Sequence, residues 1–266
     1  MAISERVHTS VSPTPRAGLA GLAVAVGVVT VVLAGLVGGI FAGLAGFDDG
    51  GAIARYGLPV ARVLLDVSAS LTIGLLLLAG TIVPERNSTD RRRTACRIAV
   101  VTGSVWVLAS LVLLILSISN ISGIHVSDPT FGAQVASVLW EFAYFRIIMI
   151  STLVALAATL LAAGARTPTA ITWAAALAVV SVLILALIGH SAGAAAHDTA
   201  VNSLAVHMAA AAVWMGGLAA LVILRPTLGA DLGTVAARYS HLALWAYAGI
   251  AISGILNASL RISSLS

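Results

Sequence analysis

The sequence contains very few of the residues that a soluble protein needs on its surface. Charged residues make up 9% of its 266 positions, hydrophobic residues make up 60%, and the mean hydropathy is +1.07. A soluble domain carries roughly a quarter charged residues. So few polar side chains cannot cover a surface in water, and lipid is therefore the expected solvent of the chain.

Lysine is absent, because all fourteen basic residues are arginines. Aromatic residues make up only 5%, too few for a base-stacking platform, so the net charge of +4 does not indicate a nucleic-acid partner. Most arginines lie in short connections between apolar runs, where they set the orientation in the membrane. Cys96 is the single cysteine, which excludes an intramolecular disulfide, a CxxC pair and a thiolate cluster.

Motifs of nucleotide-driven and hydrolytic enzymes are also absent. The sequence has no Walker A motif, no GxSxG, no HExxH, and no GxGxxG in a strand–helix context. The chain is therefore not expected to be an enzyme.

The apolar runs predict membrane-spanning helices. Residues 1–17 form a polar tail, expected in the cytoplasm, and residues 18–266 form the predicted transmembrane domain. The runs long enough to cross the ~30 Å hydrocarbon core are 18–46, 60–83, 98–119, 146–165, 170–189, 203–224 and 240–260. The expected fold class is an all-α, polytopic transmembrane helix bundle of about seven spans.

Arginine counts predict the orientation. Ten of the fourteen arginines fall on one side of the predicted topology, five of them between residues 84 and 97. The positive-inside rule places that side, and the N-terminus, in the cytoplasm. An odd number of spans leaves the C-terminus outside without a basic anchor, so the native chain is expected to continue beyond Ser266.

Histidines gather on the predicted outer side. His190, His197 and His207 follow one another with the spacing H-x6-H-x9-H, from the end of one span to the first turns of the next. Imidazole is the commonest metal ligand in proteins, and ligands on adjacent helix ends and the loop between them can converge. The three histidines are thus the predicted metal site. The alternative is that they are interfacial residues bonded to backbone or water.

The helix that His207 opens carries further candidates. Met208 and Met215 lie near it, and thioether with imidazole suits Cu(I). Ala211, Trp214 and Met215 recur with His207 at helical spacing, and Trp214 could close over a site. The alternative is a packing face, because small residues drive helix association in membranes.

Asp66 is the one acidic residue well inside an apolar run. An intramembrane carboxylate is costly and by default indicates function. Arg62 lies one turn earlier, however, so an i,i+4 ion pair is an equally good interpretation.

The sequence around the histidines resembles the copper resistance protein D (CopD) family. The resemblance covers about residues 190–260. It rests on Gly189-His190, on His207-Met208 with Trp214, Gly216, Gly217 and Leu218, on Arg238-Tyr239-Ser240, and on Ser253-Gly254. His190, His207, Trp214, Gly216 and Gly217 match the family pattern, and His197 lies in its more variable loop.

The resemblance implies a multi-pass protein of the bacterial plasma membrane that handles copper, importing it from the outer side. Copper ions or a copper chaperone are the implied partners, besides the lipid bilayer. In many actinobacteria such a domain is fused ahead of a CtaG-like cytochrome c oxidase assembly domain. Delivery of copper toward oxidase assembly is therefore a second implied role, with the oxidase or its assembly factors as partners.

Two alternatives of other classes stay open. One is a b-type heme protein, in which His190 and His207 on facing helices would bind the iron. The other is a non-catalytic scaffold in respiratory-complex assembly, whose small-residue helix faces would bind partners.

Overall fold

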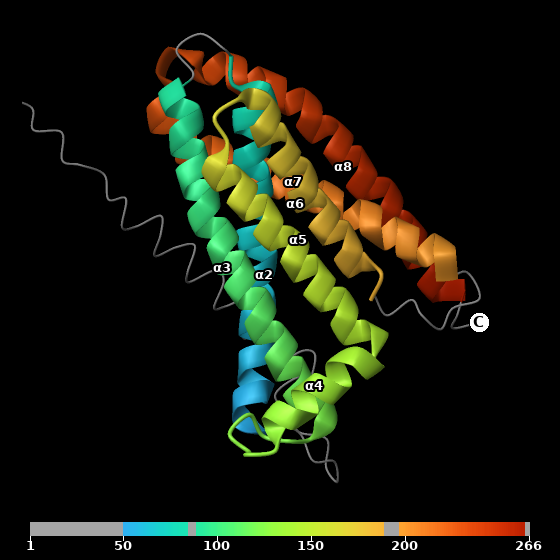
Figure 1. Cartoon of the computed structure of the whole chain (residues 1–266). Helices are drawn as coiled ribbons and strands as arrows, with labels where there is room; N and C mark the ends of the chain where they lie inside the picture. Colours follow the sequence, from blue (N-terminus) through green and yellow to red (C-terminus); the bar gives the residue numbers. More distant parts are fainter. Residues whose placement is uncertain (1–49, 85–88, 189–196, 264–266) are drawn as a thin grey trace, which may run out of the picture. The chain divides into compact units, whose positions relative to one another are not determined.

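All regular elements of the computed structural model are helices. The model describes residues 50–84, 89–188 and 197–263, and no strand occurs among them, which confirms the expected all-α class. The elements, labelled in Figure 1, are α2 (Gly51–Leu77), the π-helix η1 (Leu78–Ile82), α3 (Thr89–Ser122), α4 (Phe131–Glu141), α5 (Ala143–Gly164), α6 (Pro168–Ala186), α7 (His197–Leu228), the 3-10 turn η2 (Gly229–Asp231) and α8 (Leu232–Ser263).

Five helical stretches of the described chain are long and apolar enough to cross a membrane. The last of them, Val201–Ser259, contains two helices, α7 and α8, joined at η2. These two are antiparallel, because the Ser203 hydroxyl donates to the carbonyl of Ser253, fifty residues later, at 3.0 Å. The apolar runs expected between residues 60 and 260 each coincide with a helix. The run at 18–46 lies outside the described residues, so the total of about seven spans stays a prediction, as does the orientation.

The helices expose apolar side chains on their outer faces and bury small residues between them. Leu160 is 64% exposed and Trp173 is 65% exposed, whereas Ala155 and Ala174 are fully buried. In water such exposed surface would promote aggregation, but in a bilayer it contacts acyl chains. The buried alanines let neighbouring helices approach closely.

Hydroxyl pairs connect the helices across this core. Thr72 of α2 and Thr102 of α3 share a hydrogen bond of 2.8 Å between their Oγ1 atoms. Ser151 of α5 and Ser181 of α6 are both buried, with their Oγ atoms 3.0 Å apart. Interhelical hydrogen bonds in membrane proteins contribute ~0.6 kcal/mol each on average, so they fix relative position more than they stabilise.

Helices α2 and α7 cross at a pair of glycines. A Cβ placed on Gly216 would lie 1.8 Å from the carbonyl oxygen of Ser70, and one on Gly74 would lie 2.0 Å from the backbone of Gly216. A Cβ on Gly217 would lie 2.3 Å from the ring of Tyr239 on α8. The Gly216-Gly217 pair therefore lets α7 touch α2 on one side and α8 on the other.

Arginines from two other helices cap the end of η1. Arg92 of α3 donates from Nε to the carbonyl of Ala79 at 3.1 Å, and from Nη2 to the carbonyl of Val83 at 3.2 Å. Arg238 of α8 donates from Nη1 to the carbonyl of Ile82 at 3.2 Å. These carbonyls end a helix and would otherwise have no intrahelical donor.

A second contact joins α3 to the turn between α7 and α8. Arg91 forms an ion pair with Asp231 of η2 and donates from Nε to the carbonyl of Thr227 at 3.0 Å. Arginines near the beginnings of α3 and α8 thus lie at the same end of α2, as expected for connections on one side of a membrane.

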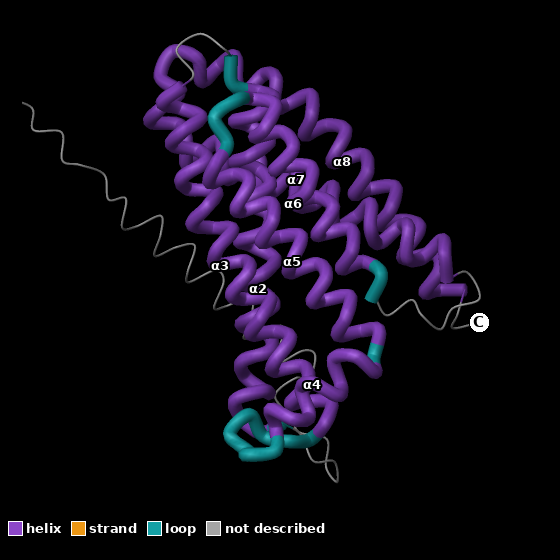
Figure 2. Tube along the Cα trace, viewed as in Figure 1, coloured by secondary structure: helices purple, strands orange, loops and turns teal. Residues whose placement is uncertain are grey.

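Helix α4 is too short to cross a bilayer. Its 11 residues extend ~16 Å, and it exposes Trp140 (69%) beside the start of α5. The guanidinium of Arg146 donates to the Trp140 carbonyl. Figure 2 shows α4 at the end of the α3–α5 pair and the short loop that joins α5 to α6.

Candidate functional site

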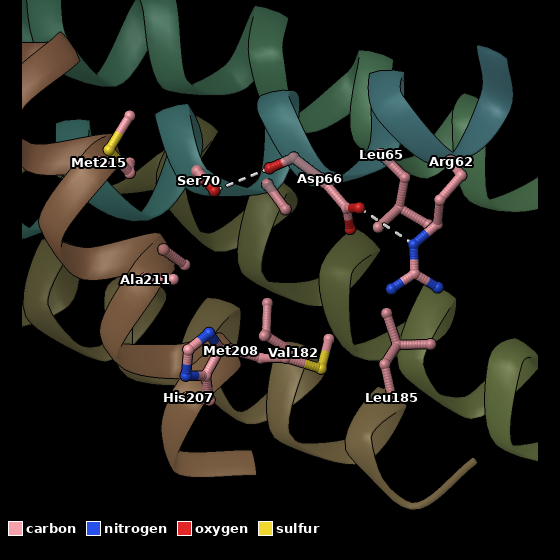
Figure 3. A pocket seen from close by; sticks show the side chains of 12 residues that line it. Arg62, Leu65, Asp66, Ser70, Val182, Leu185, His207, Met208, Ala211 and Met215 are labelled. Carbon is pink, nitrogen blue, oxygen red and sulfur yellow. Dashed lines mark hydrogen bonds and ion pairs between the residues drawn. The ribbon is translucent and has the colours of Figure 1, made fainter. Parts of the chain in front are cut away.

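A pocket of about 270 Å³ opens between α2, α6 and α7. Figure 3 shows the side chains that line it. From α2 come Arg62, Leu65, Asp66, Ala69 and Ser70; from α6 come Val182 and Leu185; from α7 come His207, Met208, Ala211, Ala212 and Met215. The pocket thus brings polar and sulfur-containing side chains into a part of the bundle that is otherwise apolar.

Helical periodicity explains why these residues share one space. Residues 207, 211 and 215 are spaced four apart on α7, and residues 62, 66 and 70 have the same spacing on α2. Such positions lie on one face of a helix. Because the glycine contact at Gly74 and Gly216 holds α2 against α7, these two faces stay adjacent just beyond the crossing.

His207 is oriented by a hydrogen bond from α8. Its Nδ1 lies 3.1 Å from Oγ of Ser253, and that hydroxyl donates its own proton to the carbonyl of Gly249. With the serine proton on that carbonyl, the Ser253 oxygen can accept from Nδ1–H, and in that tautomer the lone pair of the ring is on Nε2. Metal-binding histidines usually donate their other ring N–H to an oxygen acceptor, and the Ser253 hydroxyl can serve as one here.

Asp66 and Arg62 form the ion pair that their spacing predicted. Arg62 Nε lies 3.0 Å from Asp66 Oδ2, and the two side chains are 45% and 50% exposed. The carboxylate also lines the pocket, facing α7 and α6. The two interpretations of Asp66 are thus compatible, since it is paired on its own helix and also lines the same pocket as His207 and Met208.

The donors in the pocket are soft. One imidazole and the thioethers of Met208 and Met215 line it, together with a single carboxylate. Soft sulfur ligands select Cu(I) over hard cations such as Mg²⁺ or Ca²⁺. The volume of about 270 Å³ lies below the ~300–1,000 Å³ of pockets for drug-sized ligands, so it suits an ion better than a heme.

Of the three predicted histidines, the structure describes the side chain of His207 alone. His207 lines the pocket, His197 is the first residue of α7, and His190 lies outside the described residues, as does the side chain of His197. Ten residues of helix separate His197 from His207, a rise of ~15 Å. Among residues 50–84, 89–188 and 197–263, no group of three or more His, Cys, Asp or Glu side chains is arranged to hold a metal ion. The three-histidine site stays a prediction.

Other histidines lie away from the pocket. His125 packs against the start of α2, where a Cβ on Gly51 would lie 2.4 Å from its Cε1. Near it, Asp128 accepts hydrogen bonds from the hydroxyl and the backbone N–H of Thr130, and these bonds hold the pKa of Asp128 below its ordinary value. His241 is an exposed residue of α8.

Trp214 does not close over the pocket. Its ring packs edge-on against Tyr247 of α8, with centroids 5.9 Å apart, and the Tyr239 hydroxyl donates to its carbonyl. With 3.6 residues per turn, Trp214 lies ~20° round α7 from His207, on the side away from Met208. That side faces α8, so Trp214 stabilises the α7–α8 pair.

The α2 and α6 contributions were not expected from the sequence. Asp66 drew attention as an intramembrane carboxylate, but nothing local indicated that α2 lies against His207. Gly74 and Gly216 could have indicated that α2 packs against α7, because small residues mark close helix crossings.

The comparisons with known proteins point to one family. The model of the copper resistance protein D-like, N-terminal domain matches residues 52–201, which is more than half of the chain. This range extends from α2 to the first turn of α7 and includes the α2 and α6 walls of the pocket. The chain matches no curated protein and no solved structure at a level that indicates a relationship.

Proposed function

The chain belongs to the copper resistance protein D-like family, and we propose that it takes up copper from the outer side of a bacterial plasma membrane through the pocket at His207. Membership in this family indicates a membrane protein of copper resistance. We propose in addition that it takes up copper, that copper moves inward, and that the pocket residues are its ligands. No nucleotide is needed, because an existing gradient or a copper chaperone would drive the step.

The observation that carries the proposal is the setting of His207. Its Nδ1 lies 3.1 Å from Oγ of Ser253, which orients the ring, and the ring lines a pocket that also holds two thioethers. A polar group within a membrane bundle is costly unless it is used. An oriented imidazole beside two thioethers is suited to bind a copper ion that passes between the helices.

We propose that the three histidines act in succession. His190 and His197 would receive copper near the surface, and His207 would accept it ~15 Å further along α7. Because the backbone positions of His197 and His207 lie that far apart along α7, we propose that they bind copper one after the other. Two shallow ligands and one deeper ligand would form an entry route.

Copper uptake into proteoliposomes tests the proposal. His207→Ala should lower the initial rate by about tenfold or more, because loss of a group that only orients a ligand already costs ~10–100-fold in affinity. His241→Ala is the matched control, since it removes an exposed imidazole that does not line the pocket.

Other outcomes would redirect the assignment. Equal uptake by wild type and His207→Ala would exclude this pocket as the route. Copper that binds to wild type but stays on the protein would favour delivery toward oxidase assembly over import. A Soret band in the purified protein would favour the heme alternative.

A further inference from the structure

The pocket contains one negative and one positive side chain, and they neutralise each other. Asp66 and Arg62 are 3.0 Å apart, and both line the pocket. The other lining residues in the described part of the chain carry no fixed charge. The guanidinium therefore holds the position beside the carboxylate that a cation could take.

We propose that the pocket is a binding site for one monovalent soft cation, Cu(I), with Asp66 as its counter-charge, and that Arg62 leaves Asp66 when the ion enters. The inference rests on the proposed function and specifies its site. It adds Asp66, Met208 and Met215 to the histidines and assigns the oxidation state of the ion.

Charge balance supports a monovalent ion. A single-charged ion replaces the guanidinium at Asp66 one for one, so the site near the carboxylate stays neutral. A divalent ion at the same place would leave one uncompensated positive charge among apolar helices, which is strongly disfavoured in a membrane. Among the described residues the pocket offers one carboxylate, whose single negative charge is balanced by one Cu(I) or its analogue Ag(I).

The neutral donors match the same ion. His207, Met208 and Met215 provide one imidazole and two thioethers, a set that favours Cu(I) over Zn(II) or harder ions. His207 and Met215 are eight residues apart on α7, a rise of ~12 Å. The donors thus form successive positions along the pocket, and Asp66 on the facing helix neutralises the ion between them.

The ion pair is suited to exchange. Arg62 precedes Asp66 on α2, the less favourable order for an i,i+4 pair, and both side chains are about half exposed. Arg62 lies one turn nearer the Gly51 end of α2, which is the predicted outer end. A long arginine side chain released from Asp66 can extend toward that surface and keep its charge in water.

The test is metal binding to the purified chain in lipid nanodiscs. Ag(I) and Cu(I) are titrated against a competing chelator of known affinity, and Cu(II) and Zn(II) are titrated in parallel. Asp66→Asn should weaken Ag(I) and Cu(I) binding by about tenfold, because the counter-charge is lost. Arg62→Gln should tighten it by about threefold, because the competing cation is removed and such pairs are individually weak.

The thioethers are tested with a matched set of variants. Met208→Leu with Met215→Leu should weaken Ag(I) binding by about tenfold. Met149→Leu is the control, because Met149 packs on α5 outside the pocket and its replacement removes a thioether that cannot bind there. Thermal unfolding of each variant separates a loss of ligands from a loss of fold.

Two results would overturn the inference. One is an Arg62→Gln variant that binds Ag(I) no more tightly than wild type, which would make the pair purely structural. The other is wild-type protein that binds Zn(II) or Cu(II) as tightly as Cu(I).

The inference and the proposed uptake can fail separately. If the His207→Ala variant loses copper uptake while the Asp66 and methionine variants bind Ag(I) normally, this site assignment fails and the uptake proposal stands. If Ag(I) binding follows the predicted order but no copper crosses the bilayer, the uptake proposal fails and the site stands.

Discussion

The two ends of α2 use polar side chains in opposite ways. At the end formed by η1, Arg92 and Arg238 donate to backbone carbonyls and hold three helices together. In the pocket, Asp66 and Arg62 are about half exposed, and within the described part of the chain they bond only within their own helix. The first end is a structural joint, and the second leaves its polar groups available to a ligand.

The glycine contact between Gly74 and Gly216 separates these two regions. It fixes the distance between α2 and α7, so the pocket residues face each other without bonds of their own across the gap. The comparison predicts that substitutions on the structural side will change stability, and that substitutions in the pocket will change binding.

The largest effect is expected at the crossing itself. Gly216→Ala would place a Cβ 1.8 Å from the Ser70 carbonyl oxygen, and two helix backbones cannot separate without losing their packing. We expect a loss of stability of about 3 kcal/mol or more, at the upper end of overpacking effects. Thermal unfolding in detergent measures it.

Gly233→Ala is the control for this substitution. It adds the same methyl group in the first part of α8, where a Cβ would have nothing within 4 Å. It should leave stability unchanged or raise it slightly, because alanine favours helix over glycine. Equal effects of the two substitutions would contradict the assignment of the crossing.

A smaller loss is expected at the arginine-capped end. Arg92→Gln removes donors from the carbonyls of Ala79 and Val83, and unsatisfied buried acceptors cost about 1–3 kcal/mol. Arg97→Gln, on the exposed face of the same helix, should change stability by less than ~0.5 kcal/mol. Copper binding by Arg92→Gln should stay at the wild-type level once the loss of stability is taken into account.

The sequence predicted the helices well because each is a long apolar run whose signal is local. It also predicted His207 as a candidate, since a histidine that opens a span is conspicuous in so apolar a chain. It did not predict the pocket, because the contact between Asp66 and α7 joins residues about 140 positions apart, and no local pattern encodes that approach.

The roles of the motif residues on α7 and α8 also follow only from the contacts that they make in the structure. Gly216 meets α2, Gly217 meets Tyr239, and Ser253 orients His207. From the sequence, Trp214 shared a face with His207, and the two lie only ~20° apart on it. Only the packing of α8 against Trp214 shows that this side of the face lies away from the pocket. The π-helix η1 could not be predicted, since arginines of distant helices bind its end.

In the pocket, Ser253→Ala should affect binding more than stability. The substitution removes the partner of His207 Nδ1 and so releases the ring orientation. We expect Cu(I) affinity to fall by about tenfold, at the low end of effects seen for groups that orient a metal ligand. Ser259→Ala, which removes an exposed hydroxyl from the same helix, is the control and should bind as wild type does.

The smallest effect should be that of the Asp66–Arg62 pair on stability. Half-exposed ion pairs are worth ~0.2–1 kcal/mol, so Arg62→Gln and Asp66→Asn should each shift the free energy of unfolding by less than ~1 kcal/mol. The measurement is thermal unfolding without metal. A shift as large as that of Arg92→Gln would mean that the pair holds the bundle together, and the contrast between the two ends of α2 would then disappear. If the variants change the free energy of unfolding only when Ag(I) is present, the pair acts on ion binding and not on the fold. An ion that binds only the folded state stabilises it, and it does so more when it binds more tightly.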